Sequence, residues 1–339
     1  MNSYERVMLT LEGKTPDWNP VVPIVKEWCY KQVGLEFVLE EHQVEKHVYA
    51  QTYCLSHFGY DAVLSAYGPH TESEAMGCIL KTSKGHVASI AKHTVEDYKR
   101  DLPRLKLFNP YHNKRLITIL EGQRRMKTRF QGEIPVMGFV QGPFRHTCML
   151  RGIDYVMRDI YKNKEKLREL CEIALYSLIV YAVAVITAGA DIIMISDPTS
   201  SADMLSKKHW EDWGMPLTRK LVKVIKPHGV KTILHICGNT EDRFESLAST
   251  EVDCLSLDEA VDFEKARKVL GPDYCLMGNL STNMMSFGTP DEVEETTKEV
   301  IRKAGKGGNL IVSGGCELGE TCNPENMMAM VRAAQETRI

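Results

Sequence analysis

A histidine and two cysteines stand where the sequence predicts strands to end. In residues 234–240 (LHICGNT), His235 and Cys237 are two positions apart, and side chains two apart point to the same face of a strand. Cys316 takes the matching place after a second apolar run, in residues 310–316 (LIVSGGC). One imidazole and two thiolates form a soft to borderline donor set that suits zinc. These residues therefore predict a zinc site where two strand ends meet.

Each cysteine alone has a simpler interpretation. A single cysteine near the end of a strand is more often a small buried hydrophobe than a metal ligand. Three features together favour the metal: the spacing of His235 and Cys237, the glycine directly after them, and the Gly-Gly pair before Cys316. The ten cysteines are spread over 339 residues without an export signal, so we expect them to stay reduced in the cytoplasm. A reduced His/Cys group favours metal binding over crosslinking.

Strands and helices must position these residues, and the second half of the chain alternates between the two. Continuous apolar runs predict the strands, and capped amphipathic stretches predict the helices. Such alternation is typical of a parallel sheet, either open and doubly wound or closed into a barrel. The predicted strands are 19–24, 61–65, 134–140, 191–196, 232–237, 253–257, 274–278 and 309–313; the predicted helices are 164–188, 207–226, 242–248, 263–270, 290–304 and one that Asn323 and Pro324 open.

Eight predicted strands favour the barrel. We expect an α/β chain with a (β/α)8 TIM barrel and an N-terminal extension, in which residues 1–339 form a single domain. No Gly-x-Gly-x-x-Gly turn follows an early strand, so a dinucleotide-binding sheet is not supported. Parallel barrels place their active sites at the carboxyl ends of the strands, where His235, Cys237 and Cys316 are expected.

The same residues resemble a known family. Residues 235–240 (HICGNT) and 313–316 (SGGC) look like the zinc site of the uroporphyrinogen decarboxylase superfamily, in its corrinoid-dependent methyltransferase branch. The resemblance runs from about residue 134 to the C-terminus and includes 139–143 (FVQGP), 196–206 (SDPTSSADMLS) and 277–280 (MGNL). It implies a zinc methyltransferase whose corrinoid (cobalamin) sits on a separate carrier protein. This chain has no Asp-x-His-x-x-Gly stretch of the kind that supplies a lower cobalt ligand in such carriers.

Some members of this branch transfer a methyl group to the cobalt of the corrinoid, and others transfer it from the cobalt to an acceptor. We prefer the donor side, an O-demethylase that moves a methyl group from a methoxyarene, vanillate- or veratrole-like, to cob(I)amide. This preference rests on the lack of a clear cationic pair for a sulfonate near the motifs, and on aromatic mouth-loop residues such as Tyr67. Arg145 and His146 argue for an anion instead, and thus for the alternative of methyl transfer from methylcobamide to coenzyme M or to tetrahydrofolate.

A tetrapyrrole decarboxylase is less favoured. The decarboxylase branch depends on arginines near the N-terminus that neutralise porphyrin carboxylates. In this chain Arg6 is followed by no arginine until Arg100, so two or more of those arginines are missing.

Further polar residues at predicted strand ends are candidates for catalysis and substrate binding. Asp258 is our first choice for a fourth zinc ligand, although capping of the next helix explains it equally well. Asp197 follows another strand and is predicted to orient His235 or to bind substrate, with a turn before Pro198 as the simpler interpretation. The candidate substrate-binding residues are Asn239, Asn279, Glu74 and Tyr67, for which ordinary turns or solvated loops are the alternative.

The bulk composition excludes several partners. A net charge of −3 without a polybasic run argues against nucleic acid and anionic membranes. The longest apolar run, 175–188, contains Tyr176 and Ser177 and falls short of the about 20 residues that a membrane span needs. The expected partners are a corrinoid carrier protein and a small methyl donor or acceptor, and the expected assembly is a homodimer.

Overall fold

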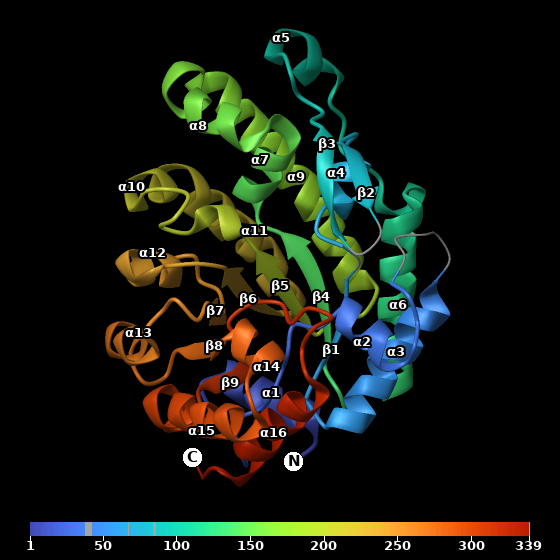
Figure 1. Cartoon of the computed structure of the whole chain (residues 1–339). Helices are drawn as coiled ribbons and strands as arrows, with labels where there is room; N and C mark the ends of the chain where they lie inside the picture. The colour runs from blue at the N-terminus through green and yellow to red at the C-terminus, as the bar shows by residue number, and fades with distance from the viewer. Residues whose placement is uncertain (38–42, 67, 84–85, 339) are drawn as a thin grey trace.

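One curled parallel sheet, surrounded by helices, organises the chain in a computed structural model that describes residues 1–37, 43–66, 68–83 and 86–338 (Figure 1). Its strands run in the order β1-β4-β5-β6-β7-β8-β9, and every neighbouring pair is parallel. They are β1 (Val63–Ser65), β4 (Val136–Gln141), β5 (Ile192–Ser196), β6 (Lys231–Ile236), β7 (Cys254–Leu257), β8 (Cys275–Leu280) and β9 (Leu310–Gly314). Seven of the eight predicted strands are present, which confirms the parallel α/β architecture.

The remaining predicted strand, 19–24, lies between β9 and β1 without forming a regular strand. Isolated parallel bridges pair Val21 with Val312 and Val25 with Leu318. On the other side, the Asp61 amide donates to the Val21 carbonyl at 2.7 Å. The segment contains two prolines, which lack an N–H group, so it cannot form a continuous hydrogen-bonded ladder. It therefore bridges the two edges of the sheet only at separate points.

Helices cover the outer face of the sheet. The predicted helix 164–188 is confirmed as α9, and 263–270 as α13, whereas 207–226 is divided. A π-helical turn, Trp210–Gly214, separates α10 from α11, and Pro216 follows it, where the missing N–H interrupts the regular ladder. The helices are α1 (Ser3–Leu11), α2 (Glu27–Gln32), α3 (Val44–Phe58), α4 (Thr71–Ala75), α5 (Tyr98–Asp101), α6 (Lys114–Phe130), α7 (Pro143–Arg151), α8 (Ile153–Lys162), α9 (Lys164–Thr187), α10 (Lys207–His209), α11 (Met215–Ile225), α12 (Phe244–Ala248), α13 (Phe263–Leu270), α14 (Thr282–Phe287), α15 (Pro290–Val300) and α16 (Pro324–Glu336).

Side chains on the inner face of the sheet change from apolar to polar along the strands. The apolar part is one buried cluster that includes Ala62, Leu64, Met137, Ile192, Met194, Ile233, Cys254, Cys275, Met277 and Ile311. Two residues further along the same inner faces stand buried polar side chains: Gln141, Ser196, His235, Ser256 and Ser313. The carboxyl end of the sheet is therefore lined with groups that can bind or react, above an apolar floor.

Helix α1 lies across the opposite, amino end. Its Val7 and Leu11 belong to the same apolar cluster as the inward side chains of the strands. The Tyr4 amide donates to the carbonyl of Glu133, which precedes β4, at 2.8 Å. Glu12 lies 3.6 Å from Lys231, the first residue of β6. These contacts with the starts of separate strands close the amino end of the sheet.

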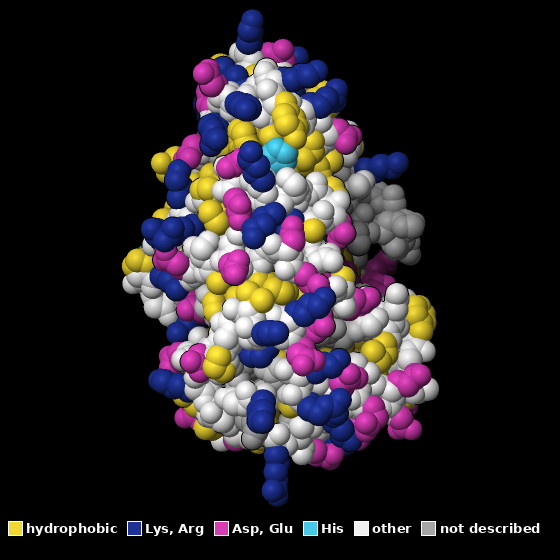
Figure 2. Space-filling view, turned by 90° about the vertical axis from the view of Figure 1, so that its left-hand side faces the viewer, with side chains coloured by type: hydrophobic (Ala, Val, Ile, Leu, Met, Phe, Trp, Pro, Cys, Tyr) yellow, Lys and Arg dark blue, Asp and Glu magenta, His cyan; other side chains and the backbone are white. Residues whose placement is uncertain are grey.

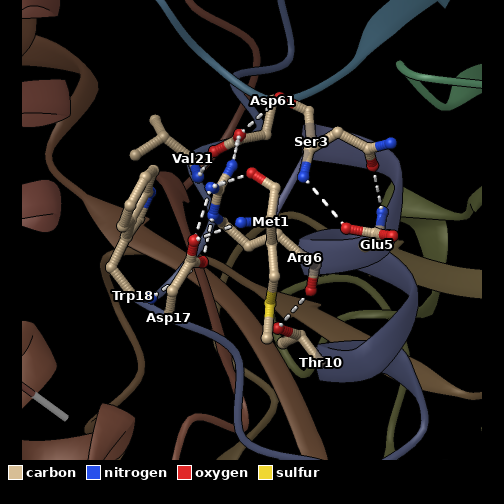
Figure 3. A network of polar contacts seen from close by, with 10 residues as sticks. Met1, Ser3, Glu5, Arg6, Thr10, Asp17, Trp18, Val21 and Asp61 are labelled. Carbon is tan, nitrogen blue, oxygen red and sulfur yellow. Dashed lines mark hydrogen bonds and ion pairs between the residues drawn. The ribbon is translucent and has the colours of Figure 1, made fainter.

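An ion-pair network that is buried at Arg6 and Asp61 and reaches the surface at Asp17 fixes α1 in place (Figure 3). The Arg6 guanidinium donates to both carboxylate oxygens of Asp17, at 2.6 and 2.9 Å, and to Asp61 Oδ1 at 2.7 Å. The other oxygen of Asp61 accepts from the Val21 amide at 2.8 Å, and the guanidinium lies 3.6 Å from the ring centre of Trp18. Every charged group here has close partners, so the network links α1 to the bridging segment and to β1.

The connection between β1 and α6 contains an insertion that the sequence patterns do not predict. A two-stranded antiparallel hairpin, β2 (Ile79–Ser83) and β3 (His86–Lys92), follows α4, and α5 comes next. The Val95 amide donates to the Leu150 carbonyl at 2.9 Å, and the Tyr98 hydroxyl donates to Asp159 at 2.7 Å. The insertion thus packs on α7 and α8, in the upper part of Figure 1. Its strands are short and contain no continuous apolar run, which explains why they give little signal in the sequence.

Helix α9 includes most of the apolar run considered above. Among the described residues, α9 is a helix that is long enough and apolar enough to cross a membrane, judged by length and composition alone. However, 56% of its most apolar stretch is buried inside the structure. Its Leu167, Leu178 and Val185 are fully buried. This burial matches the expected core helix.

Candidate metal centre

The His/Cys residues converge at the carboxyl end of the sheet as predicted. His235 is the second-last residue of β6 and lies on its inner face. Cys237 follows β6, and Cys316 follows β9. One ligand atom from each residue lies within 4.8 Å of the other two. In the described part of the chain, no further His, Cys, Asp or Glu residue joins this group.

The spacing of the three donor atoms fits zinc. His235 Nε2 lies 3.1 Å from Cys237 Sγ and 3.7 Å from Cys316 Sγ, and the two sulfurs are 3.1 Å apart. Zinc bonds of about 2.0–2.3 Å in a tetrahedral arrangement separate neighbouring ligand atoms by roughly 3.3–3.8 Å. The two N–S distances lie within about 0.4 Å of this range, whereas the two sulfurs must separate by roughly 0.7 Å to bind one zinc ion. Three ligands leave the fourth position for a substrate.

A serine on the neighbouring strand orients the histidine. His235 and Ser256 are register partners on β6 and β7, and Ser256 Oγ lies 3.0 Å from His235 Nδ1. The serine is fully buried, so its hydroxyl is held in this position. With Nδ1 engaged, Nε2 is the nitrogen that faces the two sulfurs, as a metal-binding histidine requires.

The two thiols share their protons unequally. Hydrogen bonds from Cys237 and, with a smaller effect, from His235 lower the pKa of Cys316 to about 5. The same bond, together with burial, raises the pKa of Cys237 well above its ordinary value. One thiolate therefore forms easily, and a cation is needed to stabilise the second, which matches a site built for a divalent metal.

Two buried cations flank this group. Arg145 donates to Ser196 Oγ at 3.1 Å, and Ser196 is the register partner of His235. Lys26 Nζ lies 2.6 Å from the carboxylate of Glu317, the residue after Cys316. Our expectation that no cationic pair lies near the motifs is therefore wrong. Lys26 escapes sequence reasoning because it follows the bridging segment, whose irregular pairing hides the inward direction of its side chain.

Asp197 is buried beside His235. Its amide donates to the His235 carbonyl at 2.9 Å, and its Oδ1 accepts from the Thr199 hydroxyl at 2.7 Å. Its Oδ2 has no hydrogen-bond partner among the described residues. Burial raises the pKa of Asp197 to about 6. The side chain is thus placed near the site, and its catalytic role stays a prediction.

Asp258 and Asn279 lie on the next strands and shape a loop. Asp258 Oδ1 accepts from the Ala260 amide at 2.9 Å, as a residue that begins a turn does. Asn279 Nδ2 donates to the carbonyls of Asp258 and Val261, at 3.1 and 2.8 Å. Asp258 is not part of the three-residue group, and its role as a fourth ligand remains a prediction, as does substrate binding by Asn279.

Two of the other predicted substrate-binding residues have partners outside the three-ligand group. Asn239 Oδ1 accepts from the Glu241 amide at 2.9 Å, within its own turn. Glu74, on α4, forms an ion pair with Arg115 at 3.1 Å. Tyr67 lies outside the described residues. His146, which we considered as an anion-binding group, is buried against Ser73 and the sulfur of Met76.

The parallel sheet and its His/Cys/Cys centre define a class of protein, and comparison with known proteins identifies that class. The chain belongs to the uroporphyrinogen decarboxylase (URO-D) family, whose model matches residues 2–337. The resemblance found in the sequence, to the corrinoid-dependent methyltransferase branch, is confirmed by the relatives described next.

Two relatives carry names from that branch. Methylcobamide:CoM methyltransferase MtbA of Methanosarcina mazei is 30% identical over 282 residues, 83% of this chain and 81% of that protein. Methylcobamide:CoM methyltransferase MtaA of Methanosarcina barkeri is 26% identical over 341 residues, 98% of this chain and 97% of that protein. Among solved structures, a methyltransferase from Methanosarcina mazei shares the fold with a TM-score of 0.88, covering 99% of both chains at 24% identity.

Proposed function

We propose that this protein is a zinc methyltransferase that moves a methyl group from the corrinoid of a carrier protein to a thiol. The observation that carries the proposal is the group His235, Cys237 and Cys316, whose donor atoms lie 3.1–3.7 Å apart at the carboxyl end of the sheet. The names of the relatives agree with methyl transfer from the corrinoid to a thiol. The methoxyarene donor that we favoured from the sequence receives no support from them.

The residues around the metal centre fit a thiol substrate. A zinc ion held by His235, Cys237 and Cys316 would lower the pKa of a thiol at its open position and keep it as a thiolate. Ser256 holds the His235 ring so that its Nε2 faces the sulfurs of Cys237 and Cys316. The methyl–cobalt bond breaks with its electron pair staying on cobalt, the sulfur–methyl bond forms, and the thiol proton leaves to water.

The buried cations support a thiol with an acidic end, such as coenzyme M. Arg145 has only neutral hydrogen-bond acceptors, Ser196 Oγ and the Pro69 carbonyl, among the described residues. Lys26 lies next to it with Glu317 as its ion-pair partner. A sulfonate or carboxylate offers several oxygens to such donors. Tetrahydrofolate as the acceptor finds no comparable feature here.

The remaining expectations complete the proposal. Residues 20–25 occupy the eighth position of a (β/α)8 barrel, and residues 1–339 form a single domain that acts in the cytoplasm. The ten cysteines, all unbridged, agree with a reducing compartment. A homodimer stays a prediction.

An optical assay tests the proposal. The zinc-loaded protein is mixed with methylcob(III)alamin and coenzyme M, and the methyl-cobalt(III) spectrum is followed as it converts to cob(I)alamin. We expect conversion that depends on both zinc and the thiol. The reverse experiment supplies cob(I)alamin and a panel of methoxyarenes. Formation of methyl-cobalt(III) there, without thiol methylation, would contradict the proposal and restore the donor-side reaction.

A further inference from the structure

The insertion between β1 and α6 differs in charge from the rest of the molecule. Residues 79–114 contain eight Lys and Arg against three Asp and Glu, whereas the whole chain has 42 against 45. Five of these cations are exposed and form no ion pair with a described residue: Lys81, Lys92, Lys99, Arg104 and Lys106. Lys and Arg predominate at the upper end of the molecule in Figure 2, while both signs mix over the lower half. We name the described residues of this segment, 79–83 and 86–114, the basic insertion.

Topology places the basic insertion on the same face as the metal centre. In a parallel sheet, the connection from the end of a strand to the start of its crossover helix runs along the carboxyl edge. Residues 66–113 form that connection for β1 and α6. At its base, the Glu72 carboxylate accepts from the amide of Gln141, the last residue of β4, at 3.0 Å. The basic insertion therefore extends from the carboxyl side of the sheet, the side on which His235 and both cysteines lie.

Exposed apolar side chains accompany these charges. Ile79 is 56% exposed, Leu107 48% and Tyr111 50%. Large apolar side chains set among unpaired cations are typical of a protein interface rather than a nucleic-acid interface. The acidic remainder of the chain also repels a long polyanion.

Exposed carboxylates also follow other strands at the carboxyl end of the sheet. Asp203 follows β5, Glu259 follows β7 and Glu320 follows β9, and all three are exposed. None of the three forms a side-chain ion pair with a described residue. A partner that settles over the metal centre therefore meets the cations of the basic insertion and these separate carboxylates, and its own charges affect how it docks.

We infer that the basic insertion is the docking surface for an acidic face of the corrinoid carrier protein. The inference rests on the proposed function, because that function requires a second protein to bring its cobalt to the metal centre. Attraction between exposed charges speeds encounter and is screened by salt. The basic insertion thus raises the rate of productive docking without taking part in methyl transfer.

A charge-reversal variant tests this surface in the full-length, zinc-loaded chain. Lys92→Glu, Lys99→Glu and Lys106→Glu are combined, since these side chains are exposed and unpaired among the described residues. The matched control combines Lys223→Glu, Lys268→Glu and Lys306→Glu, which are exposed near the amino ends of β6, β8 and β9. The substrate is a purified corrinoid protein, loaded with methylcob(III)alamin, that the wild-type chain demethylates faster than free methylcob(III)alamin.

We expect the first variant to raise KM for the methylated carrier about tenfold or more at low salt. Its kcat, its zinc content and its reaction with free methylcob(III)alamin stay unchanged, and the control changes none of these values. An unchanged KM, or an equal rise in the control, would overturn the inference. A wild-type chain that gains nothing from any carrier over free methylcob(III)alamin would also overturn it.

Direct binding separates failure of the docking surface from failure of the proposed function. If the wild-type chain transfers no methyl group to any thiol, the proposed function fails. The Kd for the carrier, measured by calorimetry, then decides on docking: weaker binding by the first variant supports the surface, and equal binding refutes it. Loss of binding to duplex DNA or phosphatidylserine vesicles, with unchanged carrier kinetics, would assign the basic insertion to those ligands instead.

Discussion

Both ends of the curled sheet hold buried charged groups, but these groups are paired more completely at the amino end than at the carboxyl end. At the amino end, the Arg6 guanidinium is bound by Asp17 and Asp61, and the second oxygen of Asp61 is bound by a backbone amide. At the carboxyl end, Asp197 Oδ2 and Ser313 Oγ have no partner among the described residues, and Arg145 donates only to neutral oxygens there.

This difference separates stability from function within one scaffold. A fully paired network holds elements together and leaves nothing for a ligand. Neutral buried groups without a partner occur at both ends, for example Trp18 Nε1 and Asn309 Oδ1 near the amino end, so the contrast concerns the charged groups alone. The sheet thus has an amino end where the Arg6 guanidinium is paired with carboxylates and a carboxyl end where Arg145 donates only to neutral oxygens, and each can be changed separately.

The largest expected effect comes from removing a metal ligand. Cys237→Ala should lower bound zinc from about one ion per chain to nearly none and abolish methyl transfer, because two ligands hold zinc poorly. The sheet should stay folded, since Cys237 follows β6 and is only half-buried. Metal analysis and circular dichroism check both parts. A variant that keeps full zinc and activity would disprove the site.

Breaking the amino-end network should affect stability and spare activity. Arg6→Met leaves Asp17 and Asp61 without their cation, and removing one partner of a buried pair costs about 3–5 kcal/mol. Urea denaturation measures the change, and methyl transfer at low temperature should stay at the wild-type level. Arg145→Met is the matched change at the other end. It should cost less stability and lower activity, so an equal loss of stability in both variants would break the comparison.

Loss of the serine that orients His235 should weaken metal binding. Ser256→Ala frees Nδ1, and removal of such a partner typically lowers metal affinity about 10–100-fold. Competition with a zinc chelator measures the affinity. Ser313→Ala is the control, since this buried serine also lies on the inner face but has no partner among the described residues. Equal affinities in the wild type and Ser256→Ala would show that the hydrogen bond does not position the ring.

A smaller effect is expected from pH. Burial, with a contribution from Arg145, lowers the pKa of His146 to about 3, so the folded chain keeps this ring neutral. The unfolded chain binds a proton below its ordinary pKa of about 6.5, so stability is complete above that value and falls as pH drops toward 3. His146 should contribute about 2 kcal/mol to the loss between pH 7 and pH 5. Urea denaturation of His146→Gln at both values should show a correspondingly smaller difference.

Sequence reasoning succeeds where local patterns determine the structure. Continuous apolar runs located seven strands, and the alternation of side chains along a strand placed His235 and Cys237 on one face. The expectation that Cys316 meets them depended only on two strands of one sheet ending at the same edge. These features need no knowledge of long-range packing.

The rest depends on contacts between distant segments. Ser256 looks like an ordinary strand serine, and only the register of β6 and β7 places it against His235. Lys26 follows a segment interrupted by prolines, and its partner Glu317 is almost the whole chain away. The hairpin β2–β3 is short and pairs irregularly. Such features are set by tertiary packing, which one sequence does not display.

The closure of the amino end by α1 has a kinetic consequence. Val7 and Leu11 close the floor with packed side chains, so under the proposed function thiol and corrinoid would both reach the metal centre from the carboxyl side. A carrier seated there would block the way for the smaller molecule. The protein is therefore expected to follow a compulsory order, in which the thiol enters first, the carrier docks and departs, and the methylated product leaves last.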